Sequence, residues 1–163
     1  ATVMRWQPTT AYFVRKSLER GLASTFSSSP GSVYPAVHRL KRKGLIEGVA
    51  VEADGRSTEQ ISCTPAGISA VRDWIRTVEP ADALPEDPWR TRMAHAAMLD
   101  PTERLEWLID LRKAAERQRE ALSGRGELAA DVCHAAAIDN ARMLNEARLA
   151  WLDRTIAGMV TSG

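Results

Sequence analysis

The part of the sequence that decides the fold lies between residues 29 and 46. It reads Ser29-Pro30-Gly31-Ser32-Val33-Tyr34-Pro35-Ala36-Val37-His38-Arg39-Leu40-Lys41-Arg42-Lys43-Gly44-Leu45-Ile46. At about 100° per residue, one helical stripe of this stretch carries Val33, Val37, Leu40 and Gly44. The opposite face carries Tyr34, Pro35, His38, Arg39 and Arg42, with Ser32 at its upper edge. The pattern predicts a helix that packs by one face and offers a cationic face to a partner.

Both ends of this helix carry recognisable signals. Because Pro35 would break a helix interior, we expect the regular helix to begin with Ser32 as N-cap, which places Pro35 in the first turn. Ser29-Pro30 then forms an entry turn or an irregular first turn. Gly44 follows a cationic last turn and suits the left-handed conformation in which many helices end.

The residues after Gly44 predict a two-stranded wing and another helix. Residues 45–52 alternate in character as a strand does, Asp54-Gly55 is a strong hairpin signal, and residues 60–63 form the return strand. Arg56 lies beside the turn, placed to reach a minor groove or a phosphate. Thr64-Pro65 starts the next helix as N-cap and first helical residue. The buried stripe predicted for that helix is Ile68, Val71, Ile75 and Val78.

The cationic face has two interpretations. Guanidinium and imidazole groups can donate to guanine edges or phosphates, and a helix N-terminus attracts phosphate. Alternatively, residues 39–43 are only a solvated basic end that complements the helix dipole, because short basic runs are weak motifs. The wing that follows favours the first interpretation, since a basic helix, a wing and a further helix together form a winged helix suited to a DNA groove.

At this point the sequence resembles the PadR family of transcriptional regulators. The matching segments are residues 8–12, 29–40, 44–46, Gly55-Arg56 and Thr64-Pro65-Ala66-Gly67. The resemblance implies a dimeric winged-helix repressor whose third helix enters the major groove. It places Ser32, Tyr34, Pro35, His38 and Arg39 at the DNA-facing end. Departures from the family pattern are Ala11, Phe13 and the wing segment Ser57-Thr58-Glu59-Gln60, where Glu59 is expected to repel phosphate.

Composition and charge fit a DNA-binding half followed by another domain. Residues 1–80 hold eleven Lys and Arg against seven Asp and Glu, whereas residues 81–163 hold eleven against fourteen. We predict a winged-helix domain at residues 1–78, a Pro-rich acidic linker at 79–88 and a helical dimerisation domain at 89–163. The chain begins with Ala1 rather than Met, so we expect a trimmed or processed amino terminus.

The location expected for the protein is the cytoplasm. No apolar stretch has the length of a membrane span, and no signal peptide is visible. Cys63 and Cys133 form no Cys-x-x-Cys pair, so both are expected to be buried thiols in a reducing compartment.

The C-terminal half predicts three helices. A short one covers Trp89 to Met98, and a capping box at residues 100–103 starts a second that ends near Leu122. The last runs from about Glu127 to Met159, roughly 50 Å at 1.5 Å per residue. A helix of that length cannot hide its apolar face within this chain. We therefore expect a homodimer, with docking on a different protein as the alternative, and a two-fold dimer would read a palindromic operator.

The chain contains five tryptophans, whose expected roles differ between its two halves. Trp6 and Trp74 are expected in or beside the winged-helix core. Core packing is the usual role of Trp89, Trp107 and Trp151, but these residues are also candidates to line a pocket for a planar aromatic effector, as in some PadR-like proteins. We find no nucleophile elbow, phosphate-binding loop or His-Glu-x-x-His motif, and adjacent Cys133 and His134 suit a shared metal site poorly. We expect no cofactor, no metal and no enzymatic activity.

The sequence thus predicts a mainly α protein in which a winged helix-turn-helix with a two-stranded β-wing precedes a C-terminal helical dimerisation domain. The expected function is a cytoplasmic homodimeric regulator that binds specific double-stranded DNA, most simply a repressor released by a small-molecule effector. The DNA-binding residues are Ser32, Tyr34, Pro35, His38, Arg39, Arg42 and Arg56. Two alternatives are a winged-helix module that binds an acidic protein partner and a ligand sensor whose main output is allosteric.

Overall fold

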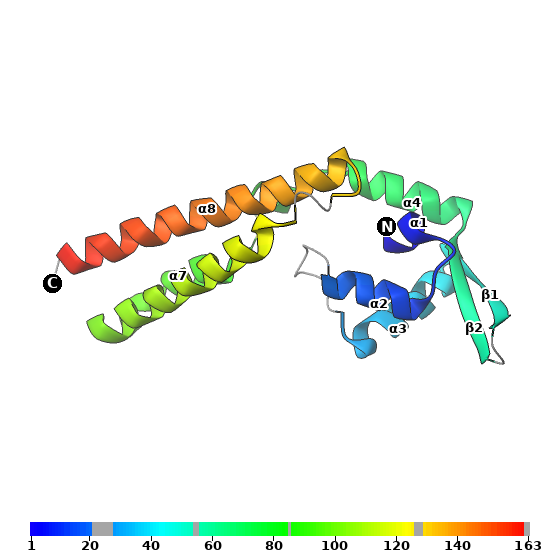
Figure 1. The fold of residues 1–163 in the computed structure, drawn as a ribbon, viewed down its shortest axis with the longest axis horizontal. Coiled ribbons are helices and arrows are strands. Elements are labelled where there is room, and N and C mark those ends of the chain that lie inside the picture. The colour runs from blue at the N-terminus through cyan, green and yellow to red at the C-terminus, as the bar shows by residue number, and fades with distance from the viewer. Residues whose placement is uncertain (21–27, 54–55, 85, 126–128, 162–163) are drawn as a thin grey trace. The chain divides into compact units, whose positions relative to one another are not determined.

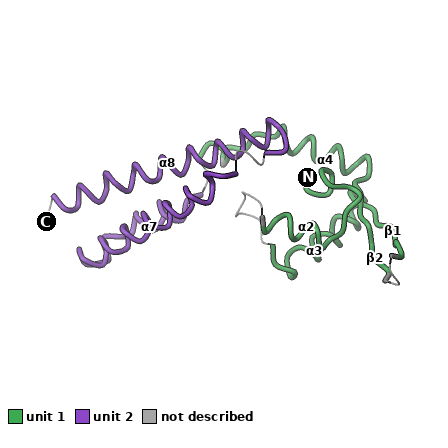
Figure 2. Tube along the Cα trace, in the orientation of Figure 1, with its two compact units in different colours: residues 1–84 green, residues 85–163 purple. Residues whose placement is uncertain are grey.

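The computed structural model describes residues 1–20, 28–53, 56–84, 86–125 and 129–161. The chain divides into two compact units, residues 1–84 and residues 85–163, which Figure 2 draws in green and purple. Each unit has a hydrophobic core of its own.

Unit 1 has the predicted mainly helical architecture with a two-stranded wing (Figure 1). Its elements are α1 (Thr2–Trp6), α2 (Ala11–Arg20), α3 (Pro30–Arg42), β1 (Ile46–Ala53), β2 (Arg56–Cys63), α4 (Pro65–Arg76) and α5 (Pro80–Ala83). The short helix α5 occupies part of the segment predicted as a linker. The order of elements is the one the sequence predicts.

The wing is an antiparallel pair in which Ile46 lies opposite Cys63 and Ala53 lies opposite Arg56. The return strand therefore begins at Arg56, four residues earlier than the pattern of residues 60–63 indicates. Residues 57–59 are polar, but they belong to β2 because they pair with residues 50–52 of β1. The predicted hairpin turn at Asp54-Gly55 lies outside the described residues.

The core of unit 1 is built from small and branched apolar side chains. Its buried members are Val3, Val14, Val33, Val37, Ile46 and Ile61. The predicted stripe of α3 is thus confirmed for Val33 and Val37, and Leu40 packs against the same core. Thr9 joins the wing to the helical layer, because its backbone exchanges hydrogen bonds of 3.0 and 2.6 Å with Ile61.

The start of α4 fits closely against the turn that ends α3. Gly44 adopts the predicted left-handed conformation, with φ of 65°. Thr64 is the predicted N-cap: its hydroxyl accepts from the Gly67 N–H at 3.1 Å and donates to the Gly44 carbonyl at 2.7 Å. A side chain at Gly67 would overlap the Leu45 carbonyl group, so only glycine allows this approach.

The C-terminal part of α4 differs from the prediction. Ile75 is 68 % exposed, and Val78, which is 85 % exposed, follows the C-cap Thr77 and lies outside the helix. Trp74 is 61 % exposed and borders a hollow that the core residues Val3 and Ile46 also line, so it lies beside the core, which the prediction allows. Trp6 is 48 % exposed and packs edge-on against Phe13. The helical spacing of Ile75 was read correctly, but no surface in the described part of unit 1 covers this side chain, and Val78 was wrongly placed in the helix.

Unit 2 is entirely helical in its described residues. It comprises α6 (Pro88–Met93), the 3₁₀ helix η1 (Ala96–Met98), α7 (Pro101–Ser123) and α8 (Val132–Thr161). The predicted helix from Trp89 to Met98 is therefore split in two. The capping box of α7 is confirmed, since the Asp100 carboxylate accepts from the Glu103 N–H at 2.8 Å and the Glu103 carboxylate accepts from the Asp100 N–H at 3.1 Å. The last helix begins at Val132 rather than Glu127, and Glu127 lies outside the described residues.

Helices α7 and α8 pack side by side (Figure 1). The buried residues between them are Leu108, Leu111, Ala115, Leu149 and Leu152. Within this apolar layer the buried Asn145 donates from Nδ2 to the Ala115 carbonyl at 3.0 Å, so its polar amide is satisfied. None of the helices in the described part of the chain combines the length and apolar character needed to cross a bilayer.

Candidate nucleic-acid interface

Helix α3 begins earlier than the sequence suggests. Ser29 rather than Ser32 is the N-cap residue, and its carbonyl accepts from the N–H groups of Ser32 and Val33 at 3.0 Å. Pro30 takes the first helical position, for which the fixed φ of proline is suited. Pro35 consequently lies inside the helix, on its exposed face. The hydrogen bond that its ring removes would have reached the carbonyl of Gly31, which is exposed and open to water.

The exposed face of α3 carries the predicted side chains in ordered rows. Tyr34, His38 and Arg42 follow one another at four-residue intervals, and Pro35 and Arg39 form a parallel row. All five are exposed. Because α3 is anchored in the core by its opposite face, this face of the helix is held rigidly with its functional groups outward.

The arginines of this face are free to bind a partner. Among the residues that the structure describes, Arg39 and Arg42 have no ion pair or side-chain hydrogen bond, and both are exposed. Ser32 is exposed in the first turn, where the Ser29 hydroxyl donates to its oxygen at 3.0 Å. The helix thus presents a hydroxyl at its amino end and guanidinium groups toward its carboxyl end.

Lys41 behaves differently from its cationic neighbours. Its Nζ forms an ion pair with Glu59 Oε1 on β2, and its side chain is only 23 % exposed. The sequence analysis expects Glu59 to repel phosphate, and the structure adds that this carboxylate is paired within the protein. No local signal could have revealed the pair, because eighteen residues separate the partners.

Arg56, the predicted wing contact, begins β2. The placement of its side chain lies outside what the structure describes. The next residues of the wing, Ser57 and Thr58, are exposed and polar. Among its described side chains, the wing therefore offers hydroxyl groups and no cation to DNA.

The three tryptophans of unit 2 pack against the α7–α8 core, each half-buried. The Arg148 guanidinium lies 4.9 Å from the ring centre of Trp89 and also donates to Asp87 at 3.1 Å. Burial alone would raise the pKa of Asp87, but the Trp89 N–H and Arg148 outweigh it and lower that pKa below its usual value. One face of Trp89 is thus occupied by protein.

Trp107 lines a hollow in unit 2. The other residues of this hollow are Arg92, His95, Ala96, Met98 and Leu99. The structure therefore gathers the three predicted effector residues around one core and opens Trp107 to this hollow. An effector site at all three tryptophans stays a prediction.

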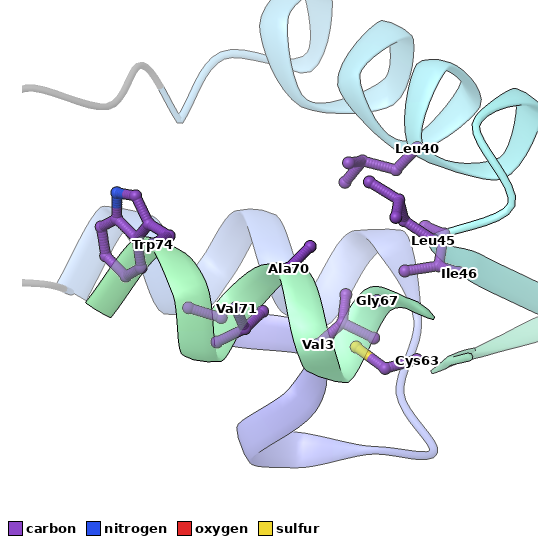
Figure 3. A pocket seen from close by; sticks show the side chains of 10 residues that line it. Val3, Leu40, Leu45, Ile46, Cys63, Gly67, Ala70, Val71 and Trp74 are labelled. Atoms are coloured by element: carbon purple, nitrogen blue, oxygen red, sulfur yellow. The ribbon is translucent and has the colours of Figure 1, made fainter. Parts of the chain in front are cut away.

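A second hollow, of about 180 Å³, lies in unit 1 (Figure 3). Val71 and Trp74 of α4 line it on one side, and Leu40 and Leu45 line it on the other. Cys63 also borders this hollow and is half-buried, whereas Cys133 is exposed on α8, so the expectation of two buried thiols is wrong. Burial raises the pKa of the Cys63 thiol. In the described residues no group of three or more His, Cys, Asp or Glu could hold a metal ion.

Comparison with known proteins places these features in a family context. Residues 2–73 match the model of the "Transcriptional regulator PadR-like family". A stretch of 51 residues is 39% identical to transcriptional regulator Rv3488 of Mycobacterium tuberculosis. This match covers 31% of the chain and 48% of Rv3488, so the aligned region spans about half the length of that relative.

Two solved structures share the fold over most of the chain. Bacillus subtilis PadR in complex with operator DNA is similar with a TM-score of 0.79 and 16% identity, over 93% of this chain and 89% of that one. The same protein in complex with p-coumaric acid is similar with a TM-score of 0.72 and 16% identity, over 93% and 90%. At this level of identity the likeness establishes the fold, including the long C-terminal helices.

Proposed function

We propose that the chain, whose residues 2–73 match the model of the PadR-like family of transcriptional regulators, binds operator DNA through α3 and regulates transcription as a homodimer. The observation that carries this proposal is a pair of exposed arginines, Arg39 and Arg42, which have no ion-pair partner among the described residues. They lie on a helix that Val33 and Val37 fix from behind. The match of residues 2–73 to a family of transcriptional regulators also supports the prediction that the chain is not an enzyme.

The exposed face of α3 has the chemistry that a DNA groove requires. Arginine can donate two parallel hydrogen bonds to a guanine edge or bind a phosphate, and Tyr34 and His38 add a hydroxyl and an imidazole in the same row. Ser32 and the amino end of the helix suit a phosphate, which fixes the register of the protein on the duplex. In this proposal Arg56 and the wing hydroxyls contact the adjacent backbone. Bacillus subtilis PadR has been solved with operator DNA, and the shared fold supports operator DNA as the ligand here.

Homodimerisation is supported by the apolar surface of α8. With 30 residues, α8 is about 45 Å long, and α7 covers only the face that carries Leu149 and Leu152. Large apolar residues remain exposed elsewhere on this helix: Val132, Met143, Leu144 and Val160. A second copy of the chain would bury them and would pair two α3 helices across a two-fold axis. Such a dimer reads a palindromic operator with half-sites about one helical turn apart.

Replacement of single arginines tests the DNA face. We expect Arg39→Ala and Arg42→Ala to weaken operator binding while the dimer persists. Loss of a base contact removes about 1–3 kcal/mol of discrimination, and loss of a phosphate contact reduces the slope of log K against log salt by about 0.9. Arg72→Ala is the matched control, because Arg72 is an exposed and unpaired cation on α4 among the described residues.

The same titration separates DNA binding from the alternative of a protein-interaction module. The operator is first selected from random duplexes, and its affinity is then measured across a range of salt concentrations. Several phosphate contacts give a steep fall in affinity as salt rises. If the protein shows no affinity for any duplex in dilute buffer, or if both arginine variants bind as the wild type does, the proposed interface is wrong.

Repression relieved by a small planar aromatic effector is the finer part of the proposal. Bacillus subtilis PadR has been solved with p-coumaric acid, and here the hollow beside Trp107 also contains Arg92, whose charge suits a carboxylate. Quenching of tryptophan fluorescence by planar aromatic acids, followed by release of bound operator, tests the effector. A reporter gene behind the selected operator gives the sign of regulation. As a DNA-binding regulator the protein would act in the cytoplasm.

A further inference from the structure

The ion pair between Lys41 and Glu59 joins the last turn of α3 to the wing. Lys41 is the one cation of the run at residues 39–43 that has an ion-pair partner among the described residues. The partner carboxylate is 51 % exposed, so its charge is presented to solvent beside the basic helix. A phosphate that passes between α3 and the wing would meet this carboxylate.

Gly48 makes the pair possible. Glu59 lies opposite Ala50 in the wing, and Gly48 is its diagonal neighbour on the same face of the two strands. A Cβ atom at Gly48 would overlap the Glu59 carboxylate and would lie 3.0 Å from Lys41 Nζ. The carboxylate therefore reaches across the space that the missing side chain leaves.

We propose that Glu59 occupies Lys41 in place of a DNA phosphate and thereby lowers the affinity of the protein for DNA of any sequence. This inference rests on the proposed function, because it assigns a role within the same DNA-binding face. Phosphate contacts supply most of non-specific binding, whereas base contacts supply discrimination. Because Lys41 is paired with Glu59, binding to the operator depends on the exposed Arg39 and Arg42. The ratio of specific to non-specific affinity for DNA therefore rises.

The test measures the salt dependence of binding to the selected operator and to a scrambled duplex. We expect Glu59→Gln to release Lys41 and to steepen the slope of log K against log salt by about 0.9, which is an additional change of about eightfold in K for each tenfold change in salt. Affinity for the scrambled duplex should rise more than affinity for the operator. The control is Glu47→Gln, which removes an exposed carboxylate from the other face of the wing, where Glu47 lies opposite Ser62.

Two further variants separate the release of Lys41 from a simple change of charge. Gly48→Ala displaces the carboxylate without altering net charge and should steepen the slope as Glu59→Gln does. Lys41→Gln should leave the wild-type slope unchanged, because the amine is already occupied, yet it should abolish the gain when combined with Glu59→Gln. Circular dichroism and the dimer mass are measured for each variant, since loss of folding would make the pair a stabilising element and overturn the inference.

The outcomes distinguish this inference from the function on which it rests. A wild-type protein without salt-dependent affinity for duplex DNA overturns the proposed function itself. If the wild type binds but Glu59→Gln and Glu47→Gln give the same slope, only the role of Glu59 is overturned. The same holds if Lys41→Gln alone flattens the wild-type slope as Arg42→Ala does, because Lys41 would then already contact phosphate.

Discussion

Replacement of Gly67 by alanine tests how α4 supports the DNA-binding helix. Gly67 is buried in the first turn of α4, against the turn that ends α3. An alanine Cβ there would lie 2.9 Å from the Leu45 carbonyl carbon and closer still to its oxygen. The Leu45 carbonyl also accepts from the Thr64 N–H at 3.2 Å, so it cannot move away without loss of that bond.

The clash outweighs the preference of helices for alanine. Alanine in place of glycine stabilises a helix interior by up to about 1 kcal/mol. Overpacking against a fixed backbone group costs about 1–3 kcal/mol and occasionally more, and here the clashing group is the main chain itself. We therefore expect Gly67→Ala to lower the net free energy of unfolding by about 1–2 kcal/mol. For a chain of this length, that corresponds to a fall in Tm of roughly 2–8 °C.

Thermal unfolding followed by circular dichroism measures this effect, and operator affinity measures its consequence for the interface. We expect a displaced start of α4 to disturb the Gly44–Leu45 turn, so operator affinity should fall together with stability. The control is Gly158→Ala in α8, where a Cβ meets nothing within 4 Å and the same substitution should raise Tm. If Gly67→Ala is as stable as the wild type, or if Gly158→Ala is equally damaging, the packing argument is wrong.

Three further predictions concern single residues. Leu152 is fully buried between α7 and α8, so Leu152→Ala should lower the free energy of unfolding by about 2–5 kcal/mol in a urea titration. If this loss is smaller than the loss from replacing an exposed leucine by alanine, the assigned core is wrong. Gly44 has a φ of 65°, so Gly44→Ala should lose about 1–2 kcal/mol from backbone strain although its Cβ meets nothing, with Gly44→Asn losing less. The lowered pKa of Asp87 favours its charged form in the fold, so its contribution is complete above the ordinary carboxyl pKa of about 3.9 and is lost as pH falls through the lower folded value. Asp87→Asn keeps an N-cap residue, so it should lower the free energy of unfolding at neutral pH but not in acid. If the difference in unfolding free energy between mutant and wild type is the same at every pH, the pairing with Arg148 is refuted.

Local signals in the sequence predicted the order of elements well. Thr64 and Asp100 are the N-caps that their neighbours indicate, and Gly44 ends α3 in the left-handed conformation. These features depend on residues within one helical turn, so the chain specifies them before any long-range contact forms. The cationic face of α3 was predictable for the same reason, because the spacing of Val33 and Val37 fixes which face is left outside.

One error has a local cause, and the other depends on distant groups. The start of α3 was placed at Ser32 because Pro35 disfavours a helix interior, yet Pro30 and the Ser29 carbonyl begin the helix three residues earlier, and exposure to water makes the missing bond tolerable. The apolar spacing of α4 was correct, but whether Ile75 is buried depends on what packs against it. Apolar periodicity predicts which residues share one face of a helix, but it does not show whether another element packs against that face.

A winged helix with a basic exposed face and a long helical extension could be predicted from the residues alone, because capping, turn chemistry and apolar spacing are properties of neighbouring residues. Which of the cations remain available depends on the folded arrangement. Lys41 and Arg42 are adjacent and chemically alike, but they point about 100° apart on α3, so one meets Glu59 across Gly48 and the other faces solvent. Charge pairing acts through space rather than along the chain, and that is the physical reason it could not be deduced from the order of residues.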